Sequence, residues 1–158
     1  MSAAWVSGAL LLMAGCTALS VRLCRDARAG VVQTEAYAAL VRLIRGQIAC
    51  YSRPFGEISR RIPPPLRQAC GLPVEGGTLE AMLGAAKLQL PADAERIVRA
   101  FAAELGKSYK TEQLAVCDAA AAELDAIAAA LRRHLPEKLR LIRCACICGG
   151  LAVIFLCM

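Results

Sequence analysis

Aromatic side chains are scarce in this chain of 158 residues, where phenylalanine, tyrosine and tryptophan together make up only 4%. Hydrophobic residues still make up 58%, more than the roughly 45–50% of an ordinary soluble domain. The excess consists of alanine, leucine, isoleucine, valine and cysteine. This mixture suits helices and contact with lipid better than the core of a β-sandwich.

Charge is missing from both ends of the chain. All 19 lysines and arginines and all 13 aspartates and glutamates lie between Arg22 and Arg143. An apolar stretch, a charged middle and a second apolar stretch are typical of a membrane-anchored protein. We therefore expect transmembrane helices at residues 1–21 and 144–158 and a helical domain at residues 22–143.

Long basic runs are missing too. The net charge of +6 is compatible with a nucleic-acid partner, but no run of lysine or arginine exceeds two residues and no aromatic-plus-basic motif is present. The basic residues instead crowd toward the apolar stretches, which membrane orientation explains. The sequence therefore argues against nucleic-acid binding.

Catalytic signatures are also absent. The only histidine, His134, lies beside Arg132 and Arg133, where a solvated or helix-dipole role is expected. There is no glycine-rich phosphate loop, because Gly76 and Gly77 stand alone in a predicted turn. The sequence predicts no enzyme, no cofactor and no small-molecule substrate.

The nine cysteines are an odd number. Most lie in apolar runs or on apolar helical stripes, where cysteine behaves as a small hydrophobe, so we expect a reducing compartment for the charged middle. Cys144, Cys146 and Cys148 alternate, and alternate helical residues point about 200° apart, so the three cannot share one metal. Cys144 and Cys148 do share a face, which leaves a metal or redox pair as an alternative. We favour small residues that let the two predicted spans approach closely, as in the pair Ala4 and Gly8 and the pair Cys146 and Gly150.

The first apolar stretch covers residues 3–21, which as a helix span about 28 Å. Trp5 lies near its outer end, where interfacial indoles are common. Three alternatives compete with a membrane span. A signal peptide needs a positive leader that is missing here, and the lipoprotein-like box at residues 12–16 lacks the same leader. A buried core helix is disfavoured by the length and by the arginines that follow.

The second apolar stretch, residues 144–158, is short for a span. Leu141 and Ile142 extend it, because Arg143 can reach the interface with its guanidinium group. The basic residues that flank the two stretches all lie on the side of the central segment: Arg22, Arg25, Arg28, Lys138, Arg140 and Arg143. The positive-inside rule then places the central domain in the cytoplasm and both termini outside.

Two apolar seams with coiled-coil spacing run through the middle of the chain. The first, on a helix predicted at residues 22–51, consists of Tyr37, Val41, Ile44, Ile48 and Tyr51. The second, on a helix that begins at Thr111, consists of Leu114, Cys117, Ala121, Leu124, Ala128, Leu131 and Leu135. No segment alternates with a period of two. We predict an all-α fold in which two long helices pair antiparallel and continue into the transmembrane helices.

Prolines and glycines divide the segment between the seams into short helices. We expect helices at residues 54–62 and 66–70, a third from an N-cap at Thr78 to about Leu90, and a fourth that Pro91 opens and Gly106 closes. These helices are expected to pack as a cap at the end away from the apolar stretches. Pro136 is expected to kink the path into the last span.

Two local patterns carry a family resemblance. One is Leu40-x-x-Leu43-x-x-x-Gln47-Ile48-x-x-Tyr51-x-x-Pro54-Phe55-x-Glu57-Ile58, and the other is Phe101-x-x-x-Leu105-Gly106-Lys107-Ser108 followed by Glu112-Gln113. With one apolar stretch at each end, the chain resembles the stage III sporulation protein AB family of endospore-forming bacteria. It departs from the family at Gln47, where glutamate is usual.

The resemblance implies a structural platform subunit of the channel complex that joins mother cell and forespore, similar to platform subunits of type II secretion and type IV pilus machines. It implies two spans in the mother-cell membrane around the forespore, with the AA ATPase and other membrane proteins of the complex as partners. The alternative is a small membrane-bound sensor or regulator that relays a signal.

We expect the ATPase to contact charged residues near helix ends and turns, where a partner can reach them; a merely solvated surface is the alternative. These residues are Arg53, Glu57, Arg60, Arg61, Lys107 and Lys110.

Overall fold

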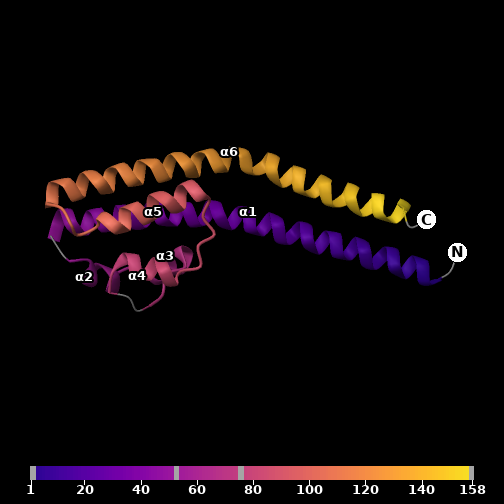
Figure 1. Cartoon of the computed structure of the whole chain (residues 1–158), viewed down its shortest axis with the longest axis horizontal. Coiled ribbons are helices and arrows are strands. Elements are labelled where there is room, and N and C mark those ends of the chain that lie inside the picture. The colour runs from indigo at the N-terminus through magenta and orange to yellow at the C-terminus, as the bar shows by residue number, and fades with distance from the viewer. Residues whose placement is uncertain (1–2, 52–53, 75–76, 157–158) are drawn as a thin grey trace. The chain divides into compact units, whose positions relative to one another are not determined.

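The computed structural model describes residues 3–51, 54–74 and 77–156, and every regular element in these ranges is a helix, as predicted (Figure 1). The helices are α1 (Ala3–Tyr51), α2 (Phe55–Arg60), α3 (Pro64–Cys70), α4 (Leu79–Ala85), α5 (Ala92–Glu104) and α6 (Lys110–Leu156). They form two compact units. The terminal unit comprises residues 1–28 and 132–158, and the central unit comprises residues 29–131.

In the central unit α1 and α6 pack side by side and antiparallel (Figure 1). Arg45 of α1 pairs with Asp118 of α6, and Lys110 at the start of α6 reaches the carbonyl oxygen of Ala49 near the end of α1. Most residues of the two predicted seams are buried in the structure: Tyr37, Val41, Ile44, Ile48, Cys117, Ala121, Leu124 and Ala128. Leu114, Leu131 and Leu135 are only half-buried, and Tyr51 is 60% exposed.

The sequence suggested that the short helices cap the end of the central unit, but α2, α3 and α4 lie along the flank of α1 and α5 lies beside α6 (Figure 1). A Cβ atom added to Gly30 would lie 3.0 Å from the carbonyl oxygen of Gln89, so the segment after α4 touches the start of this unit. Ile58 of α2 and Met82 of α4 belong to the same buried core as Ile44. The prediction failed because α1 offers an apolar flank as well as an apolar seam, and the short helices cover that flank.

Two helix boundaries differ from the prediction. Pro64 and Pro65 begin α3, because proline is well tolerated in the first turn, where the backbone N–H would lack a partner anyway. The helix after Thr78 ends at Ala85 rather than near Leu90, since Ala86 is extended, with φ −78° and ψ 145°. The Thr78 N-cap is confirmed, because its Oγ1 accepts a hydrogen bond of 3.2 Å from the N–H of Ala81.

In the terminal unit α1 and α6 approach closely at Gly150. A Cβ atom there would lie 3.2 Å from the sulfur of Cys16 and 3.5 Å from that of Met13. Gly150 therefore lies where the two helices approach closely, whereas a Cβ atom at Gly8 would meet nothing within 4 Å. Pro136 lies within α6. Among the described residues, no helical segment has both the length and the hydropathy needed to cross a membrane.

Candidate functional site

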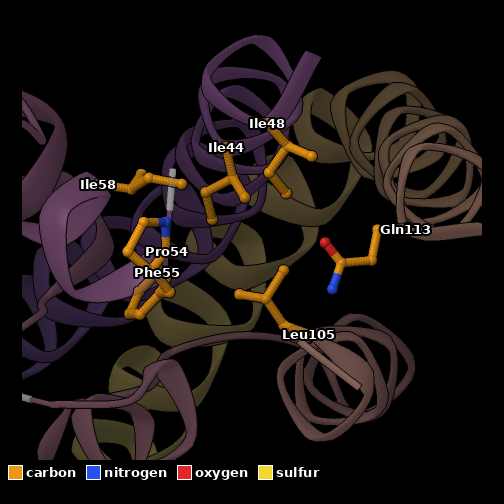
Figure 2. A pocket seen from close by; sticks show the side chains of 8 residues that line it. Ile44, Ile48, Pro54, Phe55, Ile58, Leu105 and Gln113 are labelled. Carbon is orange, nitrogen blue, oxygen red and sulfur yellow. The ribbon is translucent and has the colours of Figure 1, made fainter. Parts of the chain in front are cut away.

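An apolar pocket of about 350 Å³ lies in the central unit, where the end of α1 meets α2 and the turn between α5 and α6. Most of its lining residues have apolar side chains; the lining consists of Ile44, Ile48, Pro54, Phe55, Ile58, Leu105, Gly106 and Gln113. In Figure 2 the side chain of Leu105 faces the isoleucines of α1, and the amide end of Gln113 points toward them. The site thus combines an apolar floor with one polar group at its edge.

Local sequence explains each wall of the pocket. Ile44 and Ile48 are one helical turn apart and therefore share a face of α1. Pro54 is extended and serves as the N-cap of α2, which puts Phe55 and Ile58, three residues apart, on one face of that helix. The walls on α1 and α2 are thus set by helical spacing.

Gly106 forms the turn after α5 that contributes one wall of the pocket. Its φ of 87° lies in the left-handed region, as predicted for a glycine just after a helix end. A Cβ atom there would meet nothing within 4 Å, so the backbone angle, rather than a lack of space, requires glycine. The turn brings Leu105, which is half-buried, to the pocket.

Polar groups at the end of α1 are partly satisfied. The ammonium group of Lys110 donates a hydrogen bond of 2.9 Å to the carbonyl oxygen of Ala49, which belongs to the last helical turn and has no partner within the helix. Gln47 Oε1 is buried and accepts no hydrogen bond within the described part of the chain. The hydrogen bond from Lys110 therefore links the C-terminal end of α1 to the start of α6.

The structure places most of the predicted contact residues on the elements around this pocket. Glu57, Arg60 and Arg61 are exposed on and just after α2, Lys107 is exposed between α5 and α6, and Lys110 is exposed at the start of α6. Both groups therefore lie on elements that line the same pocket. The sixth predicted residue, Arg53, falls outside the described residues.

Two ion pairs between α1 and α6 are absent from the sequence-based expectations. Arg45 holds Asp118 with two hydrogen bonds, of 2.5 and 3.0 Å, and Arg42 pairs with Asp125. The hydrogen bond to Asp118 and its charge raise the pKa of Arg45. Such exposed pairs each contribute about 0–1 kcal/mol.

A signal for these pairs was present in the sequence. Arg42 and Arg45 each follow a seam residue of α1 by one position, and Asp118 and Asp125 do the same on α6. Positions beside a coiled-coil seam commonly carry interhelical ion pairs. The pairs therefore fix the register of the two long helices more than they stabilise them.

A buried polar cluster was missed as well. The carbonyl oxygen of Cys70, at the end of α3, accepts hydrogen bonds from the Tyr37 hydroxyl at 2.9 Å and from Gln33 Nε2 at 3.1 Å. Gln33 Nε2 also donates to the carbonyl oxygen of Lys87 at 3.0 Å, and its Oε1 accepts from the N–H of Gln89 at 2.5 Å. Gln33 and Tyr37 thus attach two separate segments to α1.

Burial makes the ionisable groups of this cluster harder to deprotonate. It raises the pKa of the Tyr37 hydroxyl well above its ordinary value and the pKa of the Cys70 thiol to about 12. The thiolate form is the reactive one, so Cys70 stays protonated and inert near neutral pH. The cluster is therefore structural.

The structure gives the exposure of the three alternating cysteines near the end of α6. Cys144 and Cys148 are exposed, and Cys146 is half-buried. Over residues 3–51, 54–74 and 77–156 there is no group of three or more histidine, cysteine, aspartate or glutamate residues that could hold a metal ion.

Comparisons of this chain with models of protein families, with curated proteins and with solved structures give no match.

Proposed function

We propose that this protein is a membrane-anchored structural platform of the channel complex between mother cell and forespore, and that its central unit docks a cytoplasmic ATPase of that complex. One observation carries the proposal: the apolar pocket at the end of α1, with charged residues on two of the elements that line it. The family resemblance of the sequence supplies the identity of the partner.

The pocket suits a protein partner because of what lines it. Apolar side chains from three elements converge there, with Phe55 and Leu105 only half-buried. Binding energy at protein interfaces concentrates where a large side chain fills a desolvated pocket of this kind. A single large apolar residue of the ATPase is the anchor that we expect.

The charges near the pocket suit recognition and steering. Arg60, Arg61 and Lys107 are exposed on or beside the elements that form it. Charges at the rim of an interface mainly change the association rate and select the partner. We therefore expect acidic residues around the apolar anchor of the ATPase.

Membrane anchoring is supported by the terminal unit. Large apolar side chains are exposed on both of its helices, with Leu11 75% and Ile147 53% exposed. Exposed apolar area of this kind is favourable in lipid and costly in water. The absence of charge before Arg22 and after Arg143 agrees with this assignment, and the flanking basic residues favour a cytoplasmic central unit.

The first test reverses charge beside the pocket. Arg60→Glu with Arg61→Glu should leave helicity and melting nearly unchanged, since surface substitutions usually cost under about 0.5 kcal/mol. The double variant should still reduce co-purification of the AA ATPase from solubilised membranes and block spore formation after engulfment. The control is Arg96→Glu with Arg99→Glu, which makes the same charge change on α5, away from the pocket.

Normal co-purification and sporulation in the Arg60 and Arg61 variant would contradict the proposed interface. Intact sporulation in a strain that lacks the whole gene would contradict the proposed function itself and favour the sensor or regulator.

A further inference from the structure

A hollow of about 660 Å³ lies on the surface of α1 in the terminal unit. Its described lining has an apolar part, Ala14, Ala18 and Val21, and a charged part, Arg22, Arg25 and Asp26, with Thr17 beside them. Apolar and charged groups of α1 therefore meet within one shallow, open hollow. A ligand that fits it must itself be apolar at one end and charged at the other.

The helical repeat aligns these residues. Ala14 and Ala18 are one turn apart, and Arg22 and Arg25 lie about one and two turns further along. The two methyl side chains leave room above the helix, while the guanidinium groups stand at one end of that room. Thr17 is already engaged, since its hydroxyl donates a hydrogen bond of 2.6 Å to the carbonyl oxygen of Met13.

The arginines are available for a ligand. Arg22 and Arg25 are both exposed, and within the described part of the chain neither forms an ion pair or a hydrogen bond. Guanidinium groups bind phosphate oxygens through paired N–H donors. Asp26 offsets part of the charge but leaves the lining with a net positive charge, which favours an anion.

We infer that this hollow binds an anionic phospholipid, with its phosphate on Arg22 and Arg25 and the start of an acyl chain over Ala14 and Ala18. The inference rests on the proposed membrane anchoring, because the chain lies beside an acyl layer only if α1 enters a bilayer. The occupant follows from the lining, since a free phosphate would leave the apolar half uncovered. Basic residues next to a span attract anionic lipids in general, and the hollow adds a defined place for one.

The test measures lipid preference at the full-length chain, reconstituted in phosphatidylcholine vesicles. Electron spin resonance compares the association of spin-labelled phosphatidylglycerol with that of spin-labelled phosphatidylcholine. The parent chain should prefer phosphatidylglycerol several-fold, and Arg22→Gln with Arg25→Gln should remove that preference. The matched control is Lys138→Gln with Arg140→Gln, which removes the same amount of charge from exposed positions of α6. This control variant should keep most of the preference for phosphatidylglycerol.

Two further variants separate the hollow from charge alone. Ala18→Leu fills the hollow without changing charge and should lower the preference. Asp26→Asn removes the opposing carboxylate and should raise it. A millimolar concentration of inorganic phosphate should not displace the labelled lipid.

Equal losses in the two double variants, or no loss in Ala18→Leu, would show diffuse attraction and overturn the site. Displacement of the labelled lipid by inorganic phosphate would show that the hollow binds phosphate rather than a phospholipid. A parent chain that does not enter vesicles at all would contradict the membrane anchoring on which the inference rests. An incorporated chain without preference would contradict the lipid site alone.

Discussion

Cys70 shows at the scale of one residue how burial fixes chemistry. Its side chain is fully buried, and its carbonyl oxygen receives the hydrogen bonds of Tyr37 and Gln33. Burial raises the pKa of the thiol from 9.0 to about 12. The same burial that holds α3 on α1 therefore removes the reactivity of this cysteine.

This shift predicts a pH dependence of stability. Above about pH 9 the thiol loses its proton in the unfolded chain but keeps it in the folded one, so the free energy of unfolding should fall as the pH rises toward 12. Chemical denaturation followed by circular dichroism from about pH 8 to about pH 11 measures this slope. Cys70→Ala should make the slope smaller without removing it, because burial also raises the pKa of Tyr37 and of Cys117.

Cys50→Ala is the matched control, because it removes an exposed thiol, and should leave the slope as in the parent. Equal slopes in the parent and in Cys70→Ala would contradict the burial argument.

At the scale of helices, the packing of the apolar seam residues of α1 and α6 is expected to stabilise the central unit most. Leu124 is fully buried in this seam, whereas Ala122, two positions earlier, is exposed. Leu124→Asp should destabilise the central unit by several kcal/mol, because it buries a carboxylate without a partner. Thermal melting by circular dichroism should show a clearly lower transition, while Ala122→Asp should melt close to the parent. Similar melting of both variants would mean that the seam is wrongly placed.

Much of the helical structure could be predicted from the sequence, because it follows from helical periodicity and from local capping patterns. The two seams, the Thr78 N-cap and the Gly106 turn are all local patterns, and the structure confirms them. The early end of α4 was not predictable, because it depends on Gln33, which lies 56 positions from Gln89 in the chain and bonds to it. Long-range hydrogen bonds of this kind leave no periodic trace in a sequence.

The pocket was predictable only in part. Charged residues near helix ends suggested the right elements, but nothing local showed that α2 and the turn at Gly106 meet at Ile44 and Ile48. That meeting depends on how the short helices lie along the flank of α1, where a cap had been expected. Helical spacing identifies an apolar face and does not identify what covers it.

At the scale of the whole molecule, the proposed docking of a cytoplasmic ATPase requires that the central unit lie in the cytoplasm. We expect both termini outside the cytoplasm and the central unit inside it. An alkaline phosphatase fused after Met158 should be active, and a fluorescent protein inserted after Gly77 should fluoresce. A fluorescent protein fused after Met158 is the control and should stay dark. Fluorescence of that last fusion would contradict the two-span arrangement.

The central claim is that the pocket at the end of α1 holds the ATPase, and the most direct measurement is the affinity of the purified full-length chain for the purified ATPase. Leu105→Glu places a carboxylate in the pocket, whereas Val74→Glu makes a similar change at a side chain that is 78% exposed and does not line it. We expect Leu105→Glu to weaken binding at least tenfold, a loss of about 1.4 kcal/mol, and Val74→Glu to bind like the parent, with unchanged circular dichroism in both. Parent-like affinity of a folded Leu105→Glu variant would contradict the claim.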